Sequence, residues 1–418
     1  MLRRVLLLCG PFLALAGSVQ GQVGFDESTA LPAVGPFGPT VEVVTQKGVV
    51  SRESAATVVA QEIFTRVQIF ASLRAGYDSN SRTEQTAQGS WFTSQHVSLS
   101  YHLPSRTTQL GIVAGLGAST YTDRTTVNVF FDLSLSRHIT RRLGFNASVS
   151  AIYTSEPNLN ANVGTNSFAG NYFNLNGNLS ASYAVTPLLS TVSSFGFVVV
   201  RYENAVTAAF TDREQYTLGE QLRFSLSKTT VLTGSYSLLF VDYVDAPFDS
   251  IRQFALAGVE YRFSSHLSGQ FSAGASYRSY SEGRGQTNPN FNGSLDYAYG
   301  KNSLAWTTSY GVEQPSERGI ATQTTFRTGL TATHSFTGRI SSSLGVSYSH
   351  NENQQGASLA AIGPVFSEDV IGISLNARYQ YNSRLGFDLG FLHSEISSGQ
   401  AFQEYSRDRY SAGVSYSF

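Results

Sequence analysis

The chain has 418 residues, with 28 lysines and arginines against 29 aspartates and glutamates, which gives a formal net charge of −1. Charged residues make up 14% of the chain, well below the roughly 25% of a soluble globular domain. The balanced charge excludes a general electrostatic surface for nucleic acid. The single cysteine, Cys9, excludes a zinc site built from cysteines. The 38 glycines, 22 tyrosines and 28 phenylalanines favour one large β protein in an unusual solvent.

Residues 1–21 are predicted to be a secretory signal peptide. Met1–Arg4 is basic, Val5–Ala16 is almost continuously apolar, and Val19–Gly21 offers a suitable cleavage site. The apolar stretch is too short and wrongly flanked for a membrane-spanning helix. No later stretch approaches 18 consecutive apolar residues. If the protein lives in a membrane, it must therefore do so as a closed barrel.

Residues 22–65 form a leader that differs from the rest of the chain. Gly24–Pro39 is rich in Gly and Pro, which predicts extended structure. Ser51–Phe64 predicts one short helix with Ser51 as its N-cap. Two placements of this leader stay open, a periplasmic extension or a segment inside the lumen of a barrel.

From Arg66 onward, apolar and polar residues alternate with a period of two. A strand sorts such a pattern onto two faces, whereas an α-helix cannot. Eighteen such runs can be counted, most of them about 10–15 residues long, which suffices to cross a bilayer at the usual tilt. They lie near 66–77, 90–103, 108–121, 126–137, 143–154, 171–185, 189–202, 214–226, 231–243, 250–263, 267–280, 290–299, 303–313, 322–334, 339–350, 368–381, 385–396 and 404–418.

The connections between the runs alternate in length. Short ones such as Thr186–Leu188 and Asn382–Arg384 separate longer ones such as Asp78–Gly89 and Asn351–Phe366. Short turns on one side and long loops on the other are typical of outer-membrane barrels. We therefore predict an all-β fold, an antiparallel transmembrane barrel of eighteen strands over residues 66–418, in the outer membrane of a Gram-negative bacterium.

Aromatic residues gather near both ends of the apolar faces, where their rings suit the lipid headgroup level. The C-terminal run resembles the signal by which the barrel-assembly machinery recognises outer-membrane proteins. It consists of Tyr410, Ala412, Val414, Tyr416 and Phe418. Outer-membrane lipid and the assembly machinery are thus the expected partners.

Two runs depart from the pattern. The run 189–202 is apolar on both faces, and Glu220 interrupts the apolar row of the next run. A carboxylate that faces lipid costs free energy. Either the register slips at Glu220, or Glu220 meets a partner in a homo-oligomer.

The predicted lumen face carries Ser, Thr, Asn, Gln and Gly with scattered charges of both signs. This mixture predicts a water-filled interior without a ring of one sign. The charges either create a transverse field that acts on polar solutes or are simply solvated and paired. They are Arg74, Asp132, Arg201, Arg223, Asp242, Arg252, Glu260, Arg262, Arg278, Asp296, Glu313, Arg327, Arg378 and Asp388.

Catalytic chemistry has little support in the sequence. His96 and Ser98 share one strand face and could pair as base and nucleophile, but the alternation turns both toward the lumen. Asp388 and His393 lie on opposite faces of one run. We find no phosphate-cradling glycine loop and no ligand cluster for a metal. The chain is therefore predicted to be no enzyme and to need no cofactor or metal.

The first run ends in Arg74–Asn80, with the sequence RAGYDSN. This stretch resembles the putative β-barrel porin 2 family, whose members are outer-membrane barrels often associated with exopolysaccharide export. The resemblance implies transport of polysaccharide and assigns no catalytic residues. We therefore predict a porin-like channel that passes hydrophilic solutes or a secreted polysaccharide by passive conduction. The alternative is a structural or surface-interaction barrel with an occluded lumen.

Overall fold

The computed structural model describes residues 67–103, 105, 107–155, 171–203, 212–244, 249–280, 285–313, 320–356, 362–399 and 404–418. The predicted signal peptide and the leader with its helix over Ser51–Phe64 lie outside these ranges. No helix of the described residues is long and apolar enough to cross a membrane. The strands are β1 (Val67–Asp78), β2 (Ser90–Leu103), β3 (Thr108–Tyr121), β4 (Thr125–Thr140), β5 (Leu143–Thr154), β6 (Tyr172–Ala184), β7 (Leu189–Tyr202), β8 (Arg213–Ser225), β9 (Thr230–Tyr243), β10 (Ser250–Arg262), β11 (Leu267–Tyr280), β12 (Gly285–Tyr299), β13 (Asn302–Glu313), β14 (Ile320–Ser335), β15 (Ile340–Gly356), β16 (Ile362–Gln380), β17 (Leu385–Ser398) and β18 (Tyr405–Ser417).

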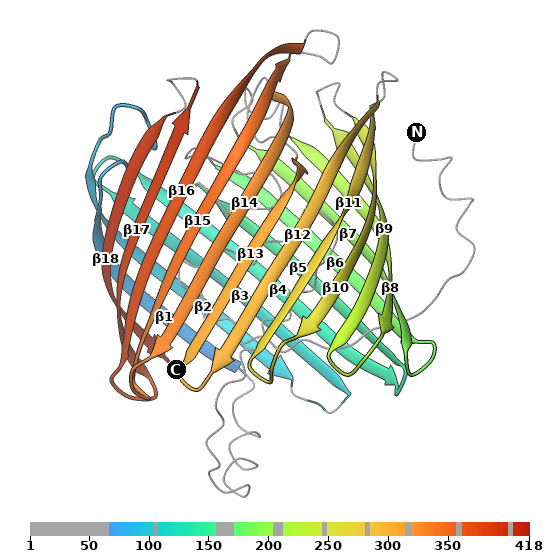
Figure 1. Ribbon diagram of the computed structural model, residues 1–418. Helices are drawn as coiled ribbons and strands as arrows, with labels where there is room; N and C mark the ends of the chain where they lie inside the picture. The colour runs from blue at the N-terminus through green and yellow to red at the C-terminus, as the bar shows by residue number, and fades with distance from the viewer. Residues whose placement is uncertain are drawn as a thin grey trace, which may run out of the picture.

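The strands form a closed antiparallel barrel (Figure 1). Each strand pairs with its neighbours in sequence, and β1 pairs with β18 over Phe70–Asp78 and Arg409–Ser417. The backbone N–H of Phe418 donates to the carbonyl of Ile69 over 2.9 Å. Closure gives every strand two paired neighbours, so no edge strand faces lipid. The predicted eighteen-stranded antiparallel barrel is confirmed.

The two faces of the wall differ in polarity, as the alternation predicts. Trp91 and Leu116 lie on the outer face and are 71% and 59% exposed, whereas Ser94 and Ser119 are buried on the inner face. Residues paired across a ladder share a face, so the register carries this assignment from strand to strand around the barrel. The apolar outer face is the band that lipid covers.

Five of the short connections share one local design. In the turns that follow β6, β8, β10, β14 and β16, one side-chain oxygen accepts hydrogen bonds from the backbone N–H groups two and three residues later. These acceptors are Thr186, Ser227, Ser264, Thr337 and Asn382. Such side chains replace the backbone partners that a tight turn lacks. We call this end of the barrel the turn side and the opposite end the loop side.

Several strands are longer on the loop side than predicted. β15 and β16 extend through most of the predicted loop Asn351–Phe366, and β12 begins at Gly285 rather than near residue 290. Polar composition suggested loops there, but the strands pair with each other above the lipid band. Pro289 fits because Gly285–Asn290 pairs with β11 and not with β13, and proline is tolerated where one strand edge is open.

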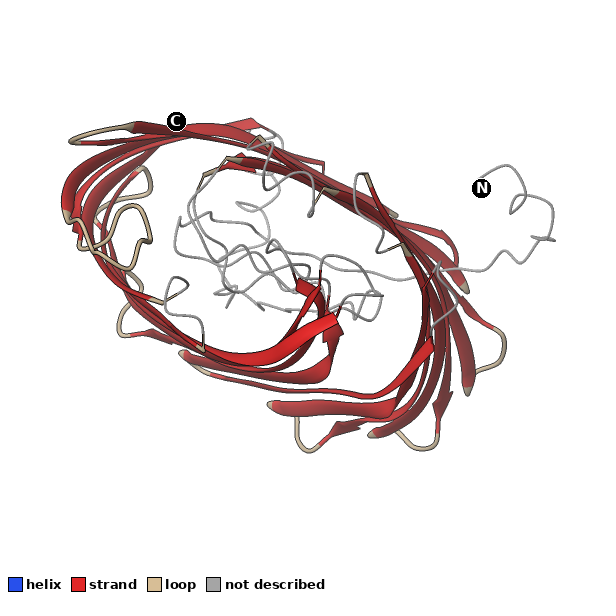
Figure 2. Cartoon of the chain, turned by 90° about the horizontal axis from the view of Figure 1, so that it is seen from above, coloured by secondary structure: helices blue, strands red, loops and turns tan. Residues whose placement is uncertain are grey.

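The wall is not circular in cross-section. Seen from above, it is elongated, and strand ends curve over the interior (Figure 2). One contact reflects this curvature, because the Nη1 of Arg252 on β10 donates to the carbonyl of Val312 on β13 over 2.5 Å. Two strands lie between β10 and β13 in the ladder, so the side chain bridges part of the lumen.

The register does not slip at Glu220. Neither the β7–β8 nor the β8–β9 ladder contains a shift, and Glu220 lies opposite Ser193 and Tyr236 on the outer face. The hydroxyls of Thr191 and Ser193 both donate to its carboxylate. Tyr236 in turn donates to Gln253 of β10 over 3.0 Å. Of the two alternatives for Glu220, the slip is excluded, and the oligomer remains a prediction.

Candidate functional site

The candidate site is the inner wall of the barrel. The structure places on this wall Arg74, Asp132, Arg223, Arg252, Glu260, Arg262, Arg278, Asp296, Glu313, Arg327, Arg378 and Asp388, all predicted from the alternation. Their role in the lumen remains a prediction, because position alone does not test it.

Two predicted lumen charges lie on the outer face instead. Arg201 pairs in register with outward Phe173, and Asp242 pairs with outward Glu214. Arg201 contacts Glu214 over 2.6 Å. Near the loop side, β7 and β9 are apolar on both faces. The polarity of their residues therefore did not show which ones face the lumen. At the loop-side rim an outward charge sits beyond the hydrocarbon, where it costs little.

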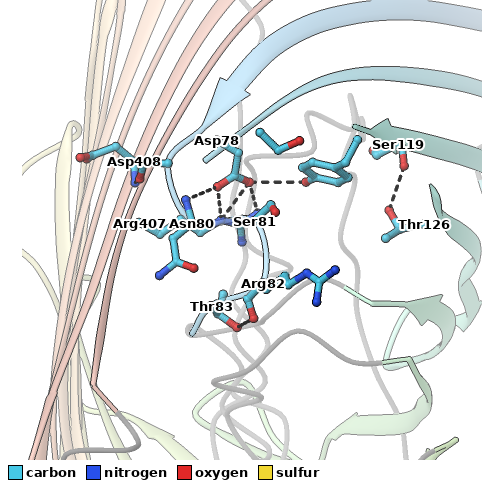
Figure 3. A network of polar contacts seen from close by, with 12 residues as sticks. Asp78, Asn80, Ser81, Arg82, Thr83, Ser119, Thr126, Arg407 and Asp408 are labelled. Atoms are coloured by element: carbon cyan, nitrogen blue, oxygen red, sulfur yellow. Dashed lines mark hydrogen bonds and ion pairs between the residues drawn. The ribbon is translucent and has the colours of Figure 1, made fainter. Parts of the chain in front are cut away.

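The Arg74–Asn80 stretch closes the barrel wall at the β1–β18 seam (Figure 3). Asp78 is fully buried and accepts hydrogen bonds from Arg407 of β18, with Nε at 3.0 and 3.1 Å and Nη2 at 2.5 Å. The Asp78 carboxylate also accepts from the backbone N–H of Asn80. The Asn80 side chain donates to the carbonyls of Glu84 and Ser406 and accepts from the N–H of Glu84. This stretch therefore fixes the first loop and the last strand together.

A second link crosses the seam closer to the turn side. Arg74 of β1 contacts Asp388 of β17 over 2.8 Å, reaching across β18. The glycine between them makes room, because a Cβ on Gly413 would lie 2.5 Å from Arg74 and 3.0 Å from Asp388. Gly76 is equally constrained, since a Cβ there would lie 2.0 Å from the backbone oxygen of Tyr410. Side chains other than hydrogen would push the seam apart.

The loop-side half of the wall from β10 to β16 holds a cluster of charges, which we call the charged wall. Glu313 and Arg327 form a buried pair at 2.9 Å. Buried Asn351 donates to Glu368 over 2.9 Å and accepts from Thr325 over 3.0 Å. Arg252 and Arg278, both 1% exposed, lie opposite each other on β10 and β11. Basic and acidic groups thus share one section of the lumen.

The opposite section of the ladder is uncharged, and we call it the asparagine wall. Asn146 of β5 and Asn174, Asn176 and Asn178 of β6 all face the lumen. The side-chain oxygens of Asn146, Asn174 and Asn178 are buried and accept no hydrogen bond. The four asparagine side chains as a whole are half-buried, so this row presents uncharged amide groups to the lumen.

Ion pairing also tunes charges in the loops. Arg82 donates to Asp123 over 2.6 Å between the β1–β2 and β3–β4 loops. This hydrogen bond lowers the pKa of the Asp123 carboxyl and raises the pKa of the Arg82 guanidinium. The pair is exposed, so water and salt screen it and it contributes little to stability.

The His96–Ser98 pair faces the lumen, as expected from the alternation. The His96 ring stacks on Phe130 at 5.3 Å and meets Phe70 edge-on at 6.3 Å. In the described part of the chain, no group of three or more His, Cys, Asp or Glu residues is placed to hold a metal ion.

A family model described as putative β-barrel porin 2 matches residues 67–418. The chain belongs to this family. Its place in the bacterial outer membrane, which we predicted from the alternation, is confirmed by this membership. Membership of this family indicates an outer-membrane channel of the porin type. The comparison with curated proteins gives no match.

Several solved structures resemble this porin 2 barrel at low identity. OccAB4 of Acinetobacter baumannii is 11% identical, covering 85% of this chain and 99% of its own, with a TM-score of 0.45. OccK2 (OpdF) of Pseudomonas aeruginosa is 12% identical, covering 84% and 98%, with a TM-score of 0.46. The siderophore receptor PirA of P. aeruginosa is 11% identical, covering 84% and 80%, with a TM-score of 0.41.

Sequence reasoning missed several inward charges of the porin 2 barrel. They stand at or near the loop-side ends of their strands, where the periodic runs merge with polar loops. Extending the alternation to the end of each run would have found them, because they keep the parity of the inward row. They are Asp78, Arg213, Glu368, Arg407 and Arg409.

Proposed function

We propose that the barrel conducts hydroxyl-rich hydrophilic solutes, such as glycans, passively across the outer membrane. The observation that carries the proposal is the asparagine wall, a row of half-buried, uncharged amide side chains on the inner face. An amide oxygen accepts a hydrogen bond from a sugar hydroxyl and carries no net charge, so it holds a neutral glycan weakly. Weak and repeated contacts let a solute enter and leave, as conduction requires.

A secreted polysaccharide is one substrate of this chemistry. The family resemblance that implied exopolysaccharide export supports it, and so does the uncharged row of asparagines along β5 and β6. A gradient and a polar wall suffice, so the proposed transport needs no bond to be made or broken.

The proposal is tested in planar bilayers and in proteoliposomes, with residues 22–65 present and deleted. We expect steady conductance in KCl and liposome swelling with neutral oligosaccharides. Replacing Asn146, Asn174 and Asn178 by Ala should slow oligosaccharide entry several-fold and leave KCl conductance nearly unchanged. Current only after deletion would make the leader a plug. Absence of current in both forms would overturn the channel and favour an occluded, structural barrel.

A further inference from the structure

Arg252 and Arg278 form a buried pair of like charges on the inner wall. They lie directly opposite each other in the β10–β11 register, and both are 1% exposed. Arg278 donates from Nε to Ser250 over 3.0 Å. Arg252 donates from Nη1 to the Val312 carbonyl, but its Nε and Nη2 atoms are buried and donate to nothing. Two N–H-bearing atoms of one guanidinium are thus left for an acceptor.

Further donors lie on the same face of β11. Tyr280 and Ser276 flank Arg278 at two residues on either side, and the buried hydroxyl of each has no hydrogen-bond partner. The Arg278 guanidinium lies 4.5 Å above the Tyr280 ring, and that of Arg252 lies 5.5 Å above Phe254. The aromatic rings hold both guanidinium planes in place, so the unused donors are oriented before any ligand arrives.

Among the described residues, the charge of Arg252 has no carboxylate of its own. Glu313 lies close enough to Arg252 to interact electrostatically, but its carboxylate is bonded to Arg327 at 2.9 Å. Arg252 forms no salt bridge within the described residues. A buried charge without a partner is costly, and an anion between the two arginines would remove that cost.

The end of β13 that contacts Arg252 pairs with a neighbouring strand on one side only. The β12–β13 ladder stops at Phe291 and Tyr310, whereas Gly311–Glu313 of β13 still pairs with β14. The Val312 carbonyl that contacts Arg252 therefore lies on a strand end with one free edge. A ligand oxygen can take the place of this carbonyl without breaking a strand ladder.

We infer that Arg252 and Arg278, with the Tyr280 hydroxyl, form a binding site for the carboxylate group of a solute inside the lumen. A guanidinium presents two parallel N–H groups that match the two oxygens of a carboxylate. The inference rests on the proposed channel, and it adds acidic sugars to the neutral glycans that the asparagine wall suits. The charged wall would then select acidic sugars, and the asparagine wall would guide neutral glycans along the lumen.

The test uses the full chain with galacturonate as probe and galactose as its neutral match. Equilibrium binding to the refolded protein in micelles is measured first, followed by block of the KCl current by each sugar. Replacing both arginines by Gln (R252Q/R278Q) should weaken galacturonate binding at least tenfold and leave galactose unaffected. The double Lys variant (R252K/R278K) keeps the positive charge but loses the paired N–H groups of the guanidinium. Its affinity for galacturonate should therefore lie between those of the native protein and R252Q/R278Q.

Arg262→Gln is the matched control, because Arg262 faces the lumen on the same strand and lies exposed at the turn side. It should bind galacturonate like the native protein. A heat-modifiable gel band for each variant shows that the barrel has folded. Equal galacturonate binding by native protein and R252Q/R278Q would overturn the site. Galacturonate binding without current would refute the channel and support the carboxylate site. Current without galacturonate binding would refute the site and support the channel.

Discussion

Among single residues, Asp78 combines complete burial with an ion pair across the seam. Its carboxylate is fully buried and accepts from two nitrogens of Arg407, and Tyr121 donates to it from β3 over 3.4 Å. The stretch that carries the family resemblance thus holds the wall closed at the seam. A short motif identified the family, but the sequence did not show what the motif does, since Arg407 lies 329 residues away.

Removing the Asp78 carboxylate takes an ion-pair partner from the buried Arg407 guanidinium. Asp78→Ala should lower the free energy of unfolding by roughly 3–5 kcal/mol, the usual result of breaking a buried ion pair from one side. Urea unfolding in lipid vesicles measures this, with fluorescence of Trp91, which lies opposite Tyr77 beside the seam. Arg407→Ala added to Asp78→Ala should cost little more than either change alone.

The exposed ion pair of Arg82 and Asp123 is the control for the substitutions at Asp78 and Arg407. Arg82→Ala should change the free energy of unfolding by less than about 1 kcal/mol, because water screens a surface ion pair. Equal losses for Asp78→Ala and Arg82→Ala would mean that the seam does not depend on the buried pair.

At the level of strands, periodicity predicted both the number of elements and the face of most residues. It worked because each side chain alternates across a wall between lipid and water, so polarity reports orientation. It failed at the loop-side rim, where neither face meets lipid and Arg201 and Asp242 turn outward. It also took the paired ends of β15 and β16 for a loop. The contact from Arg252 to Val312 depends on the curvature of the wall, which no local pattern encodes.

Glu220 tests the lipid-facing surface of β8. Glu220→Leu should raise the free energy of unfolding of a monomeric barrel by roughly 1 kcal/mol, because a carboxylate in the lipid band is mildly destabilising. If Glu220 instead meets a partner in a homo-oligomer, the same change should dissociate the oligomer in sedimentation experiments. Gln253→Leu, also outward and two strands away, is the comparison. No change in stability or in oligomeric state would show that the hydroxyls of Thr191 and Ser193 already satisfy the carboxylate.

For the whole molecule, we expect assembly in cells and stability of the folded barrel to depend differently on Phe418. Phe418 is 68% exposed, packs edge-on to Tyr416 at 4.7 Å and contributes one backbone hydrogen bond to Ile69. Its deletion should cost only about 1 kcal/mol in refolded protein, the net value of one hydrogen bond. If Tyr410–Phe418 is the assembly signal, the same deletion should sharply reduce the amount of barrel in outer-membrane fractions of cells. Normal amounts in cells would remove that role from the terminal residue.

From the pairing of β1 with β18 we infer an order of folding. The two strands lie at opposite ends of the barrel sequence, and bringing Asp78 to Arg407 closes a loop of 329 residues. Closing a flexible loop of that length costs on the order of 5 kcal/mol in chain entropy. Closing the short turn of a hairpin costs far less, because the cost rises with loop length. Local hairpins should therefore form first and leave an open sheet with two unpaired edges. The buried ion pair should then form only in the last step. It should therefore slow unfolding of the closed barrel and have little effect on the rate of folding.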